Sequence, residues 1–228
     1  MNQNPVVHNR PGSLAVSTDR RSIEASLGLC VDELLPGMKL SVLARAERLF
    51  SSDNRIEHWK YYQAEKSNVL CWPNCGACVS YLHQGLHRKG IKSEPVSNTA
   101  LPMEAMPFAY SRGREGSVAR HVLLHVPGAG ELTIVDPTWR QFCLFLVPYA
   151  ERWEALARLT RFAGEVLVLP ENGRKQFCDE LSRIVRSHGF GQWGPSLEST
   201  EALAAHLSRI WDPAGYHPAE PEDLPADI

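Results

Sequence analysis

Cys71, Cys75 and Cys78 stand within eight positions of one another, where a Trp-Pro-Asn loop signal meets the start of an apolar helical pattern. The first turn of a helix has free N–H groups and the positive end of the helix dipole, and both stabilise a thiolate. A nucleophilic cysteine at this junction is therefore a reasonable expectation. We predict that Cys75 is the nucleophile, that Cys78 packs in the core one turn later, and we leave the role of Cys71 open.

A cysteine nucleophile needs an imidazole to hold its proton and a group that orients the imidazole. Among nine histidines, His121 opens a β-rich run, and Asp136 closes the next such run 15 positions later. In an antiparallel pair the start of one strand lies beside the end of the next, so these two side chains are expected to be neighbours. His125 shares a strand face with His121, but packing or exposure is favoured for it because Pro127 ends the strand. Asp136 also has a simpler interpretation, as a turn-forming residue before a proline.

Three segments also carry a resemblance to a known superfamily: Asn74-Cys-Gly-Ala-Cys78, Arg120-His-Val-Leu-Leu-His-Val126 and Ile134-Val-Asp-Pro-Thr-Trp-Arg-Gln-Phe142. They resemble the papain-like and transglutaminase-like cysteine enzymes, and within these the papain-fold toxin and glutamine-deamidase branch of bacterial effectors. The resemblance covers roughly residues 70–142. The chain departs from the common transglutaminase pattern at Pro73 and Leu123, so hydrolysis, deamidation and transamidation stay open.

The resemblance implies acyl transfer through a thioester, with Cys75, His121 and Asp136 as the catalytic residues. The substrate would be an amide of a protein or peptide, most plausibly a glutamine side chain. The backbone N–H of Cys75 would bind the oxyanion, a contribution of about 3 kcal/mol for one donor. Asn74 and Trp72 are candidate side-chain donors, and two further residues are candidates as well: Asn68 and Gln63.

Three alternatives remain beside this hypothesis. Two are enzymes, namely a cysteine protease and an amide-forming acyltransferase of small-molecule biosynthesis. The third is a zinc-stabilised binding module without catalysis, since Cys71, Cys75 and Cys78 precede His83 and His87 at helical spacing. Convergence of these side chains on one ion is geometrically difficult, and we predict neither a metal nor a cofactor.

Hydrophobic periodicity and turn signals predict the order of elements along the chain. Helices are expected over 22–35 (stopped by Pro36-Gly37), 40–50, 55–66, 75–88, 149–163, 174–188 and 197–210. Strands are expected over 91–96, 121–126, 132–135, 142–147 and 166–169, with a long loop over 97–118. Cys30, Cys143 and Cys178 fall inside apolar patterns and are expected to be core residues.

This order predicts an α+β fold of the papain-like or transglutaminase-like kind, with the nucleophile at a helix N-terminus packed on a small antiparallel sheet and extra flanking helices. The expected organisation is a flexible arm over 1–19, a catalytic domain over 20–212 and a disordered, acidic, Pro-rich tail over 213–228.

Composition limits the class of protein and its partners. The chain has 228 residues, 43% hydrophobic and 22% charged, with a formal net charge of −2. This balance gives no reason to expect nucleic acid or an anionic membrane as a partner. No secretory signal or apolar stretch of membrane-spanning length is visible. We therefore expect free thiols and a cytoplasmic location, or export by a leaderless secretion route.

Overall fold

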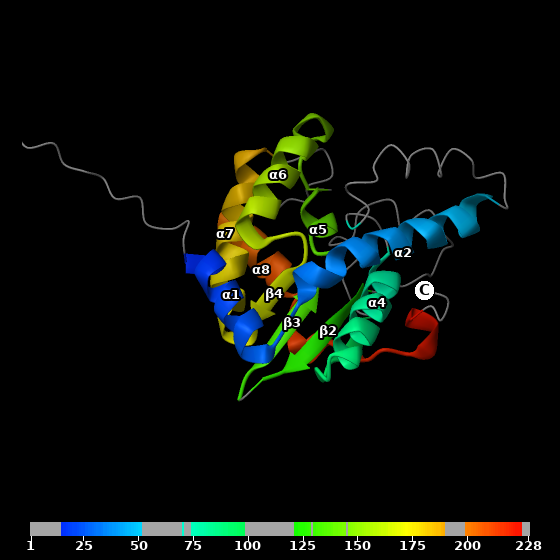
Figure 1. The fold of residues 1–228 in the computed structure, drawn as a ribbon. Coiled ribbons are helices and arrows are strands. Elements are labelled where there is room, and N and C mark those ends of the chain that lie inside the picture. The colour runs from blue at the N-terminus through cyan, green and yellow to red at the C-terminus, as the bar shows by residue number, and fades with distance from the viewer. Residues whose placement is uncertain are drawn as a thin grey trace, which may run out of the picture.

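A computed structural model describes residues 15–51, 70, 74–98, 121–128, 130–144, 146–189 and 199–224. Within these residues seven α-helices accompany a five-stranded antiparallel sheet, so the chain has an α+β fold (Figure 1). The helices are α1 (Ala15–Leu27), α2 (Val31–Ser51), α4 (Cys75–Arg88), α5 (Gln141–Leu144), α6 (Arg152–Ala163), α7 (Arg174–Ser187) and α8 (Thr200–Ser208). The strands are β1 (Glu94–Asn98), β2 (His121–Pro127), β3 (Leu132–Asp136), β4 (Leu167–Pro170) and β5 (His217–Pro218).

The strands follow the order β4-β3-β2-β1-β5, and every neighbouring pair is antiparallel. In the central pair, Leu124 of β2 lies opposite Val135 of β3. The first residue of β2, His121, lies opposite the last residue of β1, Asn98. One end of the sheet therefore gathers the start of β2, the end of β1 and the end of β3.

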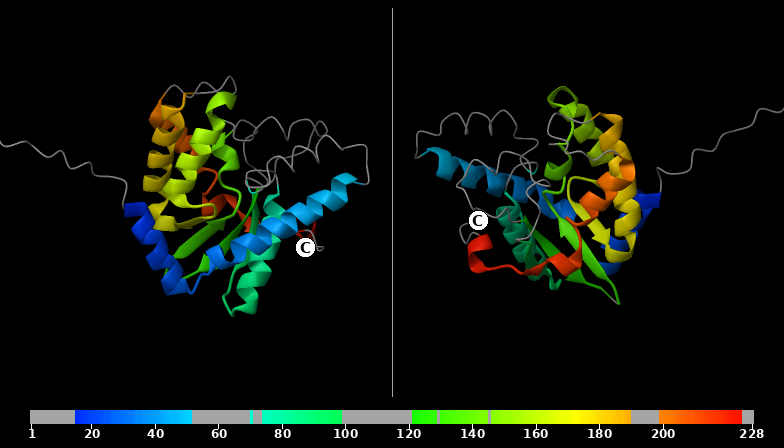
Figure 2. Two further views of the ribbon diagram at one scale, coloured as in Figure 1. Left: turned by 45° about the horizontal axis from the view of Figure 1, so that its top comes forward. Right: turned by 180° about the vertical axis from the view of Figure 1, so that it is seen from behind.

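Helices cover both faces of the sheet (Figures 1 and 2). Val122 and Leu124 point to the core formed with α2 and α4, whereas Leu123 and Ile134 point to the core formed with α6, α7 and α8. A strand buried on both faces has apolar residues in succession rather than in alternation. This burial explains the uninterrupted Val-Leu-Leu run of β2.

The predicted helix stop at Pro36-Gly37 is wrong. The α2 helix runs from Val31 to Ser51 through Pro36, and the break falls earlier, at Gly28, which has a φ of +65°. Gly37 has a different role, because a Cβ atom there would lie 2.0 Å from the Tyr81 hydroxyl of α4. The glycine allows the close approach of α2 and α4.

The predicted strand over 142–147 is also wrong. Residues 141–144 form α5, and Phe142, Cys143, Leu146 and Val147 are buried in the core on the α6–α8 face. The apolar run reflects burial at a compact turn after β3 rather than a sheet position, since periodicity does not distinguish a short buried strand from a buried helical turn.

Other predicted elements lie close to the observed ones. The helix after Cys75, the strands β2, β3 and β4, and the helices α6, α7 and α8 all form near the expected residues. β1 begins at Glu94 rather than at residue 91. The predicted helix over 55–66 lies outside the described residues, as does all of the predicted 97–118 loop except residues 97 and 98, which belong to β1.

Both predicted ends of the domain need correction. Residues 15–19 belong to α1 rather than to a flexible arm. Residues 213–224 are not a disordered tail, because β5 pairs with β1 and the Ala219 N–H donates to the Pro95 carbonyl at 3.0 Å. Figure 2 shows this C-terminal segment running alongside the sheet. The polar, Pro-rich composition of this segment predicts disorder, but its backbone pairs with strand β1 and satisfies hydrogen-bonding groups there.

Among the described residues, no helix combines the length and the apolar character required to cross a bilayer.

Candidate active site

Cys75 is the first residue of α4, at the position that the sequence predicts. The first α-helical hydrogen bond joins the Cys78 N–H to the Asn74 carbonyl at 2.9 Å. The N–H groups of residues 75–77 therefore precede the regular ladder and point out of the helix end. The Cys75 side chain is partly exposed, whereas Cys78 is fully buried. Of these two thiols, Cys75 is therefore accessible to solvent and Cys78 is packed in the core.

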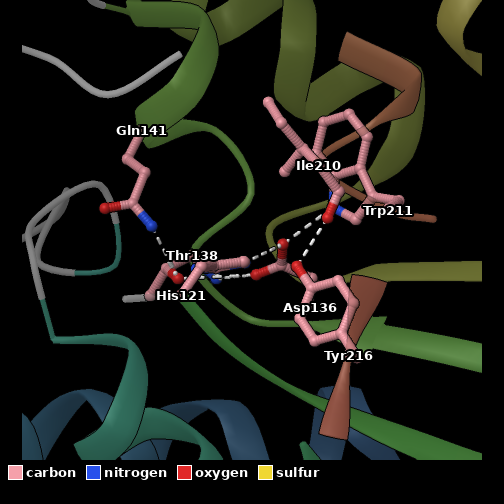
Figure 3. Close-up of polar contacts among 7 residues, drawn as sticks. All are labelled: His121, Asp136, Thr138, Gln141, Ile210, Trp211 and Tyr216. Carbon is pink, nitrogen blue, oxygen red and sulfur yellow. Dashed lines mark hydrogen bonds and ion pairs between the residues drawn. The ribbon is translucent and has the colours of Figure 1, made fainter. Parts of the chain in front are cut away.

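His121 and Asp136 form a hydrogen-bonded pair across β2 and β3. The distance between His121 Nε2 and Asp136 Oδ2 is 2.8 Å, and both side chains have 0% exposure (Figure 3). The ring edge of Phe142 packs against the imidazole, with centroids 4.6 Å apart and planes at 89°. The strand pattern predicted this neighbourhood, and the structure confirms it.

Asp136 is held by further donors on both carboxylate oxygens. Oδ1 accepts from the Thr138 backbone N–H at 2.9 Å, and the Thr138 hydroxyl lies 3.4 Å away. Oδ2 accepts from the indole Nε1–H of Trp211 at 2.9 Å (Figure 3). Asp136 thus has the turn-forming role as well as the pairing with His121. Both oxygens of the buried carboxylate are therefore hydrogen-bonded, which offsets the cost of its burial.

The His121 imidazole is held by the carboxylate on one side and is electrostatically coupled to Cys75. Burial alone lowers the pKa of His121, but the charge and hydrogen bond of Asp136, and then the nearby Cys75 thiol, raise it to about 10. Nδ1 has no hydrogen-bond partner among the described residues. With Nε2 engaged by Asp136, Nδ1 is the ring atom left to face the Cys75 thiol. The order thiol, imidazole, carboxylate is the arrangement that activates a cysteine nucleophile.

The three side chains meet at the end of the sheet rather than on one face. α4 packs with Ala77, Cys78 and Leu82 on the face of Val122, while His121 and Asp136 share the opposite face with Leu123. Cys75 reaches the imidazole because it is the terminal residue of α4 and His121 is the terminal residue of β2. The Cys75 thiol therefore approaches His121 past the ends of the strands rather than across one face of the sheet.

Two neighbouring groups are kept neutral by the same surroundings. Burial, then the charges of Cys75 and Asp136, raise the pKa of Cys78 well above its usual value. Burial, followed by the charges of Asp136 and Cys75, does the same for the pKa of Tyr216. Cys78 is therefore a packing residue, as predicted, and the Tyr216 phenol keeps its proton and donates a hydrogen bond to the Ile210 carbonyl.

The candidate oxyanion donors differ in whether the structure describes them. Asn74 directly precedes Cys75, makes no capping bond, and its Nδ2 is buried without a hydrogen-bond partner among the described residues. Trp72 lies outside the described residues, as do Cys71 and the two other candidates at 63 and 68. His125 packs against the Tyr216 ring at 5.9 Å, which agrees with the packing role expected for it.

Metal ligands do not converge within the part of the chain that the structure describes. No group of three or more His, Cys, Asp or Glu side chains there is arranged to hold an ion. His83 is partly buried and its Nδ1 lies 2.9 Å from the Ser93 hydroxyl, while His87 is exposed. A cavity of about 340 Å³ lies between α1, α6 and β4, and none of the three candidate residues lines it.

Comparison with known proteins gives no relative: no family model, curated protein or solved structure matches the chain. The interpretation of the site therefore depends on its own geometry and chemistry.

Sequence reasoning missed two residues of this site, Trp211 and Tyr216. Both follow α8, far along the chain from Cys75, and carry no motif that would link them to it. A tryptophan such as Trp211 is ordinarily a packing residue. Its 0% exposure agrees with packing, but its hydrogen bond to Asp136, 75 residues away in sequence, was not predictable from local pattern.

Proposed function

We propose that the chain is a cysteine acyl-transfer enzyme that acts through a thioester on an amide of a protein or peptide. The favoured reaction is deamidation or transamidation of a glutamine side chain. The observation that carries the proposal is the buried His121 imidazole, with Nε2 on the Asp136 carboxylate, Nδ1 without a partner among the described residues, and Cys75 close enough to help raise the pKa of the ring.

The proposed first step is attack by the Cys75 thiolate on the amide carbon. A protonated imidazole beside the sulfur stabilises the thiolate, and the Asp136 carboxylate stabilises the imidazolium. The raised pKa of His121, about 10, agrees with an imidazole that is protonated at neutral pH. His121 then gives its proton to the departing ammonia or amine, and Asp136 orients the ring throughout.

The oxyanion of the tetrahedral intermediate needs hydrogen-bond donors that are in place before the reaction. The backbone N–H of Cys75 precedes the first α-helical hydrogen bond, which begins at Cys78. Asn74, the residue that precedes the nucleophile, has a buried amide donor that finds no partner in the described part of the chain. We assign these two groups to the oxyanion. Water or a substrate amine would then resolve the thioester.

The first experiment measures chemistry at the thiol without a substrate. Iodoacetamide at pH 6 is expected to alkylate Cys75 selectively, and His121→Ala is expected to slow that alkylation at least about 10-fold. Cys30 is the matched internal control, because it is also a free and partly exposed thiol. Its alkylation should be equal in the two proteins, and equal slowing at both thiols would contradict the ion pair.

The second experiment identifies the reaction. Glutamine-containing proteins and peptides are incubated with the enzyme, and released ammonia and a mass gain of about 1 Da are measured. Cys75→Ala should abolish both signals, and retained activity in that variant would overturn the scheme. Cleavage of the peptide backbone would instead identify a protease. Stoichiometric zinc that masks the thiols of the full chain would identify the non-catalytic binding module.

A further inference from the structure

We propose that Trp211 is a positioning residue of this site, whose indole N–H holds the Asp136 carboxylate in the orientation that receives His121. The inference rests on the proposed function for its catalytic meaning. The contact itself is a 2.9 Å hydrogen bond between two side chains of 0% exposure. Trp211 lies outside the segment that resembles the cysteine enzymes, so no motif assigns this role to it.

The two oxygens of Asp136 are held in different ways. Both donors to Oδ1 come from Thr138, two residues along the same turn, so they follow Asp136 if that turn shifts. The donors to Oδ2 are His121 and Trp211, which come from distant parts of the chain. Without the indole, His121 alone would anchor Oδ2. The carboxylate could then rotate about its Oδ1 contacts and leave the imidazole.

The indole is itself immobilised. Its ring packs edge-on against Phe142 at 6.0 Å and against Phe177 at 5.4 Å. The residue that follows it is held as well, because Arg174 of α7 pairs with the Asp212 side chain at 2.6 Å. A donor that packing already holds in place loses no conformational freedom when it binds the carboxylate. Preorganised electrostatic stabilisation requires donors of this kind. Helices α7 and α8 and the C-terminal segment thus influence the Asp136–His121 pair through the indole N–H of Trp211.

The molecule contains a matched control for this group. Trp139 also has 0% exposure, belongs to the same core and packs edge-on against the same Phe177, at 5.8 Å. Its Nε1 has no hydrogen-bond partner among the described residues. Trp139→Phe and Trp211→Phe therefore remove the same ring atoms from the same core. They differ in whether an N–H to Asp136 is lost.

The experiment compares these two variants in the full-length protein. The pKa of His121 is followed by NMR of isotopically labelled histidine, and the rate of Cys75 alkylation by iodoacetamide is measured at pH 6. Trp211→Phe is expected to lower the His121 pKa by about one unit and to slow alkylation about 10-fold, because a mobile carboxylate stabilises the imidazolium less. Trp139→Phe should leave the His121 pKa unchanged and the alkylation rate within twofold of that of the unchanged protein, despite a comparable loss of thermal stability.

A His121 pKa that is unchanged or raised in Trp211→Phe, or that falls equally in Trp139→Phe, overturns the inference. If Trp211→Phe does not fold, benzothienylalanine at position 211 keeps the bicyclic ring and replaces the N–H by sulfur, and the same outcomes apply. Neither readout needs a substrate. A chain without amide turnover would therefore refute the proposed function, whereas equal behaviour of the two tryptophan variants would refute the positioning role.

Discussion

His121 and Asp136 lie diagonally across β2 and β3 rather than directly opposite each other. Leu124 pairs with Val135, so the same register continued places Asp136 opposite Leu123 and His121 opposite Thr138. The diagonal still brings Nε2 within 2.8 Å of Oδ2, since both side chains point to the same face. Thr138, at the position opposite His121, supplies the backbone N–H that holds the other carboxylate oxygen.

Asp136→Asn is expected to destabilise the protonated form of His121 while keeping the shape of the site. The charge of Asp136 is the largest of the effects that raise the pKa of His121, so that pKa should fall. In a comparable triad this substitution lowers kcat about 10⁴-fold, and we expect at least about a 100-fold loss here. Amide turnover and NMR of His121 are the measurements. Asp179→Asn, which breaks an exposed pair with Lys175, is the control and should change neither.

The free energy of unfolding should depend on pH through His121. Its pKa is about 10 in the folded protein against 6.5 for an unperturbed histidine. A pKa raised by folding means that the stabilisation is complete below pH 6.5 and is lost as the pH rises toward 10. Within pH 7–8.5 we expect stability to fall by about 1.4 kcal/mol per pH unit more than in His121→Gln. Denaturant unfolding at several pH values measures both slopes, and parallel slopes would show that His121 is not charged in the folded state.

Asn74→Ala should impair turnover without impairing the nucleophile. Removal of one oxyanion donor costs about 10²-fold or more in kcat, and the amide of Asn74 is a buried donor beside Cys75 that no described residue engages. The alkylation rate of Cys75 should stay within twofold, because iodoacetamide alkylation forms no tetrahedral oxyanion. Asn172→Ala, at an exposed asparagine, serves as the control. Slower alkylation in Asn74→Ala would indicate that Asn74 shapes the helix end instead.

Gly37→Ala should destabilise the protein, contrary to the usual effect of this change inside a helix. Alanine is favoured over glycine in helices by about 1 kcal/mol. At this position, however, the added Cβ would lie 2.0 Å from the Tyr81 hydroxyl. Overpacking of this kind costs about 1–3 kcal/mol. Thermal unfolding of Gly37→Ala, Tyr81→Phe and the double variant measures the coupling. Partial recovery in the double variant is expected, and additive losses would place the strain elsewhere.

The local sequence pattern was sufficient to predict features that depend on a single helix, strand or turn. The loop signal before Cys75, the apolar run after His121 and the turn at Asp136-Pro137 are all local, and helix α4 and strands β2 and β3 form near the expected positions. Their pairing was also predictable, because a short Gly-rich connection joins neighbouring antiparallel strands. The prediction failed at Pro36-Gly37 and at 142–147, where contacts with distant residues outweigh the local signal.

The residue types and spacing thus determine the nucleophile, base and acid as candidates, and they place each one at the end of its own element. The tertiary structure brings these ends together and supplies the contacts that hold them in place. Trp211 reaches Asp136 across 75 residues, and β5 completes the sheet from a segment whose composition suggests disorder. The reason is physical: a hydrogen bond between buried groups depends on packing from several elements at once, and no single stretch of sequence encodes it.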